Sequence, residues 1–373
     1  MHIDADNKRF QDFIEETEKK LDMEITVEKC PSNADNRQAK ISTILASGDK
    51  NIDLISVNDE MISEFKHKGY LEPLEKNVMT EEVRDSFPQK YLESICEENG
   101  HIYSVPFQMD IMMFWVNQEL LKQAGLDEIK NTGDFDILQK SLKNPDQYAY
   151  GDAWENTYVY NSLSQFVNFW GGDYFDWTDP KTKDAARYMK SMLDEKNTSP
   201  AQFVDQYEQM EEKFIRGKYG CVFMYTSALG TFLDADVYGK NKIHMAPLPV
   251  LHKKKATNIA TWQYVLNNAS ENKDAAVRFL QYAAGYEGST EYAKIMKSYP
   301  ARVDVIENED IDLEGIDMIR KYLREYTLNA RPLCENSMGA VSDMGKLFQG
   351  YVLGQCEEDS FFEQAQNCIN TYY

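Results

Sequence analysis

The sequence lacks long apolar runs, an excess of basic residues and paired cysteine motifs, and each absence excludes a class of protein. No apolar stretch reaches the roughly 18 residues that a membrane-spanning helix needs. Forty basic residues face 62 acidic ones, and the resulting net charge of −22 repels nucleic-acid phosphates and anionic lipid. The six cysteines form no Cys-x-x-Cys motif and are too sparse for a disulfide scaffold. Free thiols are therefore expected, with a bridge between Cys356 and Cys368 as the alternative.

Signals of catalysis or cofactor binding are also absent from the sequence. There is no phosphate-binding loop, no Gly-x-Gly-x-x-Gly, no Gly-x-Ser-x-Gly, and no pair of histidines three or four residues apart. Residues 310–315 resemble the start of a calcium loop, but the twelfth position is Lys321 and not Glu, so a solvated acidic loop is the better interpretation. We therefore predict no catalytic residue, no metal ligand and no cofactor.

The hydrophobic share of 42% is ample for a large core, and the length of 373 residues suits two to three domains. The first part of the chain alternates helices with strands. It predicts a helix over 7–21, a strand at 25–27, a helix over 36–46 closed by Gly48, a buried strand at 52–57 and a helix over 60–67. Such alternation favours a parallel α/β sheet.

Further strands are predicted later in the chain, among segments that are mainly helical. The expected strands are 111–116, 220–225, 243–251 and 259–266. Residues 134–240 and the chain from 273 onward are otherwise expected to be helical. The sequence contains no linker, low-complexity tract or internal repeat, so two domains would be interwoven along the chain.

Several short motifs occur in an order and spacing that resemble a known family. They include Ser-Gly-Asp at 47–49, Lys-Gly-Tyr-Leu-Glu-Pro-Leu at 68–74, Asn-Gly-His-Ile-Tyr-Ser-Val-Pro at 99–106, the segment 114–126, Phe-Ile-Arg-Gly-Lys at 214–218, the segment 272–280 and Tyr-Pro-Ala-Arg at 299–302. Together they resemble the extracellular solute-binding proteins that serve carbohydrate ABC transporters, relatives of the maltose-binding protein. The resemblance covers nearly the whole chain.

The resemblance implies an α/β fold of two lobes with a central interlobe cleft and a hinge that closes on the ligand. We expect residues 1–108 and 265–301 in the N-terminal lobe, and residues 109–264 and 302–373 in the C-terminal lobe. The implied function is a non-catalytic, monomeric receptor that captures a carbohydrate, an oligosaccharide in the first instance, and delivers it to the membrane permease.

The resemblance also implies a lipid-anchored or periplasmic location. Members begin with an export signal and a first strand, whereas only Met1, His2 and Ile3 stand before the first helix here. We therefore expect that a signal and part of that strand have been removed.

Ligand residues are expected just after the predicted strands, where carboxylates accept sugar hydroxyls and aromatic rings stack on sugar C–H surfaces. Structural alternatives are an N-cap role for the Asn58–Asp59 pair, a core role for the aromatic residues, and an interlobe ion pair for the arginine. The predicted ligand residues are Asp59, Asp110, Trp154, Glu155, Tyr225, Trp262 and Arg302.

Two other functions remain open at this point. The acidic, aromatic-rich composition would also suit a binding protein for a polyamine or another cationic solute. A glycoside-processing enzyme with paired carboxylates is a further alternative.

Overall fold

The computed structural model describes residues 1–31 and 33–373, and of Ala34 and Asp35 the backbone. The chain forms two compact units, unit 1 with residues 1–110 and 260–316, and unit 2 with residues 111–259 and 317–373. Two long strands, β4 (Ser104–Asn117) and β8 (Ala256–Leu266), contribute residues to both units. The expected lobes divided at 301/302, whereas the units divide at 316/317. Residues 302–316 belong to unit 1, because α14 (Val303–Glu307) packs against α13 (Tyr286–Met296).

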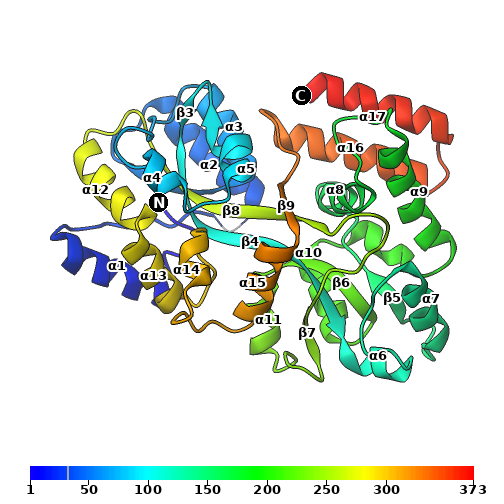
Figure 1. The fold of residues 1–373 in the computed structure, drawn as a ribbon. Coiled ribbons are helices and arrows are strands. Elements are labelled where there is room, and N and C mark those ends of the chain that lie inside the picture. Colours follow the sequence, from blue (N-terminus) through cyan, green and yellow to red (C-terminus); the bar gives the residue numbers. More distant parts are fainter. Residues whose placement is uncertain (32) are drawn as a thin grey trace. The chain divides into compact units, whose positions relative to one another are not determined.

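Unit 1 builds its helices where the sequence places apolar stripes and caps. In α1 (Lys8–Leu21), Asn7 caps the first turn, and Phe10, Phe13 and Ile14 are buried on one face. Gly48 adopts a φ of 64° and ends the next helix in the left-handed conformation, as predicted. The remaining helices of this unit are α2 (Ala34–Ser47), α3 (Asp59–His67), α4 (Glu81–Arg84), α5 (Gln89–Tyr91), the π-helical turn η1 (Leu92–Cys96) and α12 (Lys273–Ala284). Figure 1 shows α12 beside α13, and α13 beside α1.

Strand pairing in unit 1 joins its first segment, residues 1–110, to its second segment, residues 260–316. Strand β1 (Leu54–Asn58) runs antiparallel to β8, with Leu54 opposite Leu266 and Asn58 opposite Trp262. A short hairpin joins β2 (Glu97–Glu98) to β3 (His101–Ile102). The strand predicted at 25–27 is absent. Residues 23–29 form no ladder in the described part of the chain beyond one bridge between His2 and Lys29.

The strands of unit 2 pair in both directions. In unit 1, where the alternation of helices and strands favoured a parallel sheet, β1 instead runs antiparallel to β8. Strand β4 pairs antiparallel with β6 (Tyr219–Tyr225) and with β7 (Ile243–Ala246), which Pro247 follows. Parallel pairs join β5 (Tyr148–Gly151) to β6, and β8 to β9 (Thr327–Ala330). Met112 and Met113 on β4 are buried core residues, as their apolar strand predicts.

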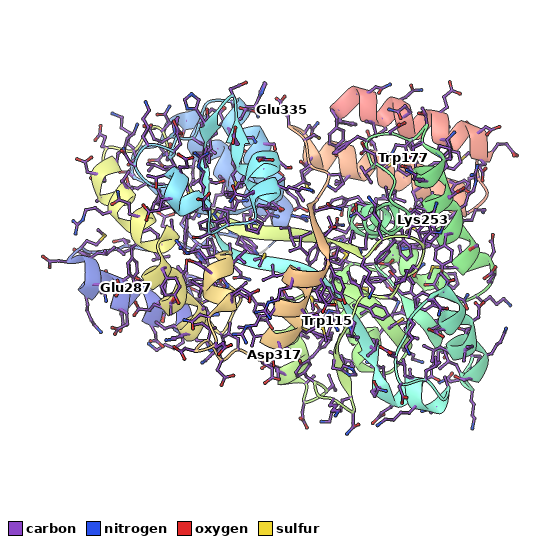
Figure 2. All side chains as sticks on the ribbon, in the orientation of Figure 1. Trp115, Trp177, Lys253, Glu287, Asp317 and Glu335 are labelled. Carbon is purple, nitrogen blue, oxygen red and sulfur yellow. The ribbon has the colours of Figure 1, made fainter. Side chains whose placement is uncertain are left out.

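The helices of unit 2 pack in pairs around these strands. Helix α8 (Val159–Trp170) packs on α9 (Pro180–Asp194), and α16 (Ser337–Val352) packs on α17 (Glu358–Tyr372). Trp115 on β4 and Trp177 near α17, both labelled in Figure 2, are fully buried, and the Trp177 ring contacts Phe361 and Phe362. The other helices are α6 (Gln118–Gln123), α7 (Thr132–Ser141), the short 3₁₀ turn η2 (Pro200–Val204), α10 (Tyr207–Ile215), α11 (Ala228–Asp234) and α15 (Ile316–Glu325), which begins at the last residue of unit 1.

All six cysteines are free thiols, so no bridge joins Cys356 to Cys368. Within residues 1–31 and 33–373, no helix has the length and apolarity needed to cross a membrane. Over the same residues, no three His, Cys, Asp or Glu side chains gather in a way that suits a metal ion.

Candidate functional site

In unit 1, the end of β1 places Asp59 inside the protein and not at its surface. Asp59 begins α3 with an exposed fraction of 0%, and its Oδ2 accepts a hydrogen bond of 3.0 Å from the Tyr91 hydroxyl. Because that hydroxyl has a single proton, it accepts from Thr261 Oγ1 at 2.8 Å and from Gln263 Nε2 at 3.1 Å. Asp59 is therefore tied to β8 through Tyr91, a residue that the sequence reasoning missed.

The same hydrogen-bond network continues from Gln263 to Ser104 and Cys96. Gln263 Oε1 accepts from Ser104 Oγ and from Cys96 Sγ. Burial raises the pKa of the Cys96 thiol to about 12, so this sulfur stays protonated and able to donate. The backbone of β8 on either side of Trp262 is thus held by buried hydrogen bonds from Thr261 and Gln263.

Trp262 itself lies between these two anchored residues and is half-buried. The Arg37 guanidinium lies over its ring, 5.2 Å from the centroid, and Arg37 Nη1 donates to Pro31 O at 3.2 Å. On the neighbouring strand, Asn58 Nδ2 donates to Glu60 Oε2 at 2.6 Å, while Asn58 Oδ1 has no hydrogen-bond partner in the described part of the chain. The result is a half-buried aromatic ring beside a buried amide oxygen that accepts no hydrogen bond within the described residues.

The two remaining predicted residues of unit 1 differ in character. Asp110 is the last residue of the unit's first segment and is 9% exposed. Arg302 is 8% exposed and uses its guanidinium within the unit, donating to both carboxylate oxygens of Asp304, to Ala284 O and to Ser86 Oγ. Four of its five N–H groups are engaged, which favours a structural role for Arg302. Its ion pair stays within unit 1, unlike the interlobe pair weighed as the alternative.

In unit 2, Trp154 belongs to a buried cluster organised by Asp152. The Trp154 ring has an exposed fraction of 0% and contacts Phe203 and Phe348 edge-on. Its Nε1 donates a hydrogen bond of 2.9 Å to Asp152 Oδ2, which also accepts a hydrogen bond of 2.7 Å from Tyr150 Oη. Burial raises the pKa of the Asp152 carboxyl, although these hydrogen bonds act in the opposite direction. The packing alternative for Trp154 is therefore the one that its surroundings favour.

The residues that follow Trp154 remain partly accessible. Glu155 is half-buried, and its Oε2 accepts from Thr157 N at 3.0 Å and from Thr157 Oγ1 at 2.7 Å, which leaves Oε1 with no bond inside the described protein. Tyr158 meets the Tyr207 ring edge-on at 5.0 Å, and both side chains are half-buried. Tyr207, from α10, is a second aromatic residue that the sequence reasoning did not select.

Tyr225 closes this aromatic group from the end of β6. It is 5% exposed, contacts the Tyr207 ring at 6.0 Å, and donates from its hydroxyl to Asn161 Oδ1 at 3.0 Å. The Arg331 guanidinium lies 5.9 Å from the Tyr225 ring centroid and donates to Tyr160 Oη at 2.6 Å. Unit 2 thus gathers Glu155, Tyr158, Tyr207 and Tyr225 into one group of acceptors and rings.

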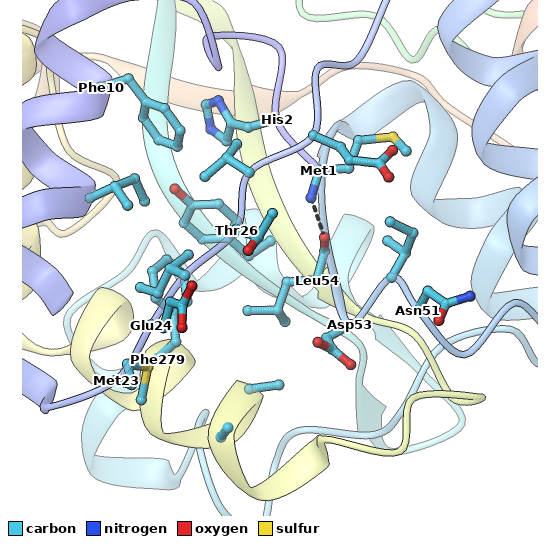
Figure 3. A pocket seen from close by; sticks show the side chains of 18 residues that line it. Met1, His2, Phe10, Met23, Glu24, Thr26, Asn51, Asp53, Leu54 and Phe279 are labelled. Carbon is cyan, nitrogen blue, oxygen red and sulfur yellow. Dashed lines mark hydrogen bonds between the residues drawn. The ribbon is translucent and has the colours of Figure 1, made fainter.

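A separate cavity of about 210 Å³ lies elsewhere in unit 1 (Figure 3). Its lining includes Met1, His2, Phe10, Tyr264 and Phe279, and it contains none of the predicted ligand residues.

The chain belongs to the bacterial extracellular solute-binding protein family, whose sequence model matches residues 4–290. Its two-lobe α/β fold is that of the maltose-binding-protein-like members of this class.

Solved structures support the fold over almost the full length of the chain. A solute-binding protein from Thermotoga lettingae, bound to α-D-tagatose, is 18% identical in sequence. The match covers 99% of this chain and 97% of the T. lettingae chain, with a TM-score of 0.83. The maltose-bound MalE3 of T. maritima is 17% identical, covers 98% and 96%, and has a TM-score of 0.81.

A curated relative shares sequence over a shorter region. The probable amino-acid ABC transporter periplasmic-binding protein y4oP of Sinorhizobium fredii is 24% identical over 242 residues, which cover 61% of this chain and 54% of the relative. The chain thus matches about half the length of that relative.

Proposed function

We propose that this protein is the non-catalytic substrate-binding component of an ABC importer and that it captures a carbohydrate. Family membership and a fold shared along the full chain with sugar-bound proteins support this proposal. The single observation that carries the choice of ligand is the half-buried Trp262, whose strand is held by buried hydrogen bonds on both sides and whose neighbour Asn58 has a buried Oδ1 with no partner in the described part of the chain. A ring beside an acceptor suits a sugar, whose C–H face stacks while its hydroxyls donate.

Within unit 1 we propose Trp262 as the stacking residue and Asn58 as a hydroxyl acceptor. Asp59 acts indirectly, by positioning Tyr91, because its carboxylate is fully buried and accepts a hydrogen bond from the Tyr91 hydroxyl. Asp110, at 9% exposed, is proposed as an additional acceptor.

Within unit 2 we propose Glu155, with one carboxylate oxygen available, as the charged acceptor. Tyr158, Tyr207 and Tyr225 supply rings beside it, and their mutual edge-on contacts fix the orientation of each ring before a ligand arrives. A preordered aromatic group loses little side-chain entropy on binding, which favours affinity for a ligand as polar as a sugar.

The proposed partners are a small carbohydrate and the permease subunits of the transporter, and the protein acts as a monomer. We also propose that it works outside the cytoplasm, anchored through lipid or free in a periplasm. The family to which the chain belongs is extracellular.

The proposal is tested by a melting-temperature screen with monosaccharides, sugar alcohols and maltooligosaccharides, because a ligand that binds the folded state raises stability by RT ln(1 + [L]/Kd). A saturating shift for at least one sugar is expected, and the sugar should be recovered intact after prolonged incubation. Hydrolysis of the sugar by the pure protein would favour a glycoside-processing enzyme instead.

A second candidate ligand class is favoured by the charge of −22 and by the relative named as an amino-acid binding protein. A basic amino acid or a polyamine carries net positive charge and would be attracted by the acidic surface. Inclusion of amino acids, putrescine and spermidine in the same screen distinguishes the two classes, since a shift by these compounds alone would contradict the carbohydrate proposal.

A further inference from the structure

Two of the ligand residues proposed in unit 2, Glu155 and Tyr158, lie on one turn, residues 155–158, that leads directly into α8. Within this turn, Glu155 O accepts hydrogen bonds from Tyr158 N at 2.9 Å and from Val159 N at 3.0 Å. The Glu155 carboxylate in addition accepts from the amide and the hydroxyl of Thr157. The side chains of Glu155 and Tyr158 are therefore directed by the backbone of the turn as a whole.

Helix α16 supports this turn through residues on one of its faces. Gly345, Phe348 and Gln349 are three and four residues apart, so they lie on the same side of the helix, and we call them the α16 seat. The Phe348 ring meets the Trp154 ring edge-on at 5.4 Å, and Gln349 Nε2 donates to Trp154 O at 2.5 Å. Figure 1 shows α16 beside α8, on which it also packs.

Gly345 lets the turn lie directly against the helix. A Cβ atom added to Gly345 would stand 2.0 Å from Asn156 O, 2.7 Å from Asn156 C and 2.9 Å from Asn156 Cα. All three are backbone atoms, so no side-chain rotation relieves the collision. Because a Cβ atom does not approach other heavy atoms more closely than about 3.0 Å, any other residue here would displace the Asn156 carbonyl by about 1 Å.

Hydrogen bonds hold the turn from other elements of unit 2 as well. Glu155 N donates to Asp205 O at 3.2 Å. Asn161 Nδ2 donates to Tyr158 O at 3.2 Å, and Asn161 Oδ1 accepts from the Tyr225 hydroxyl at 3.0 Å. A displacement imposed from α16 must therefore strain or break these bonds, and it disturbs the arrangement of Tyr158 and Tyr225.

We propose that the α16 seat is a positioning element of the ligand site, in which Gly345 and Gln349 fix the turn and so direct Glu155 and Tyr158 towards the sugar. The inference rests on the function proposed for these two residues. The seat acts through backbone atoms of Trp154 and Asn156, so its effect on affinity is indirect. A displacement of about 1 Å in the residues that support a site is enough to weaken the site strongly.

The test compares Gly345→Ala with Gly350→Ala, two identical substitutions in the same helix. Alanine is the better helix former at both positions. At Gly350 the added methyl group meets only Gln355 Oε1 at 3.9 Å, an ordinary contact, whereas at Gly345 it meets the backbone of the turn. Gln349→Met is a second change in the seat, because it keeps the length of the side chain and removes the donor to Trp154 O.

The first readout needs no ligand. Hydrogen exchange at the Glu155 and Thr157 amides, which flank the displaced carbonyl, should be at least tenfold faster in Gly345→Ala than in the wild type, and unchanged in Gly350→Ala. Equal exchange in the two alanine variants would overturn the proposal. Should Gly345→Ala fail to fold, Gln349→Met decides: faster exchange at the same amides is expected, and unchanged exchange would overturn the proposal.

The second readout is affinity, measured by isothermal titration with the tightest binder among D-tagatose, maltose and maltotriose. Gly345→Ala should raise Kd at least tenfold, and Gly350→Ala should leave it unchanged. In a Glu155→Gln background, Gly345→Ala should raise Kd by a smaller factor, because the charge that the seat positions is already absent. Equal factors in both backgrounds would overturn the positioning of Glu155, since a merely structural change acts additively.

Absence of binding by all three sugars would count against the carbohydrate proposal alone, because hydrogen exchange reports on the seat without a ligand.

Discussion

Replacement of Trp262 by alanine separates a ligand-stacking role from a packing role. A fully buried tryptophan costs about 3–5 kcal/mol of stability when it is truncated to alanine. Trp262 is only half buried, and the interactions beyond its burial are the contact with Arg37, worth about 0.5–1 kcal/mol, and the cross-strand pairing with Asn58, worth about 0.2–1 kcal/mol. Burial of part of the ring adds to these contacts, so we expect Trp262→Ala to cost about 2–3 kcal/mol of the free energy of unfolding, less than for a fully buried tryptophan.

That loss corresponds to a decrease of about 4–12 °C in the melting temperature, at roughly 2–4 °C per kcal/mol for units of this size. Sugar affinity should fall as well, because the stacking surface disappears from the contact area between the protein and the ligand. We expect Kd to rise at least tenfold, about 1.4 kcal/mol, in isothermal titration with the sugar identified by the screen.

The matched control is Trp154→Ala. Trp154 is fully enclosed by Phe203, Phe348 and the Asp152 carboxylate, so its loss should cost about 3–5 kcal/mol of stability and leave Kd unchanged at a temperature where the variant is folded. A badly destabilised Trp262→Ala with intact affinity, or a Trp154→Ala that is stable but binds poorly, would refute the reasoning for the residue concerned.

Three further substitutions test the other roles assigned here. Glu155→Gln keeps an oxygen that can accept from Thr157 but removes the charge, so sugar binding should weaken by about 1.5–3 kcal/mol while the melting temperature stays unchanged; wild-type affinity would remove Glu155 from the site. Asp152→Asn replaces one of two acceptor oxygens by a donor, so the buried donors at that position, either Tyr150 and Trp154 or Ser162 and the Ala153 amide, lose their acceptor; chemical denaturation should show a loss of about 1–3 kcal/mol, and an unchanged midpoint would contradict the cluster. Arg302→Lys cannot reproduce four directed hydrogen bonds, so stability should fall with Kd unchanged, and a Kd that rises without loss of stability would restore Arg302 as a ligand residue.

The pH dependence of stability follows from the buried Met1 ammonium. Its pKa is lowered in the folded protein, so the folded state disfavours the charged form. The penalty is complete below the folded pKa and disappears as pH rises towards the unfolded value of about 8. Denaturation midpoints of the chain should therefore increase over this range relative to those of the same chain acetylated at the Met1 nitrogen, which carries no ammonium there; parallel pH profiles would contradict the burial.

Local sequence signals predicted the helices of unit 1 well because each depends on nearby residues. The helix expected over 7–21 is α1, and Gly48 ends α2 in the left-handed conformation that a glycine adopts at least cost. The buried strand at 220–225 is likewise β6, whose seven residues are all buried. These features need no knowledge of distant partners.

Strand pairing and the candidate site could be predicted less well, because they depend on residues far apart in sequence. Ile25 and Val27 have the alternation of a strand, but a strand needs paired neighbours on its edges, and here the pairing stops at the His2–Lys29 bridge. The sequence also could not reveal that Asp59 is enclosed by Tyr91, or that Arg37 lies over Trp262, since each contact joins segments separated by tens or hundreds of residues. Trp154 was selected for its neighbours in the chain, whereas its partners Phe203 and Phe348 come from elsewhere.

The most direct test of the carbohydrate proposal is isothermal titration of the purified chain with the sugars of the screen, next to titrations with amino acids and polyamines. The account predicts saturable binding of at least one sugar with one ligand per chain, recovery of that sugar unaltered, and no binding of the cationic compounds at the same concentrations. Saturable binding of an amino acid or polyamine, with no heat from any sugar, would contradict it.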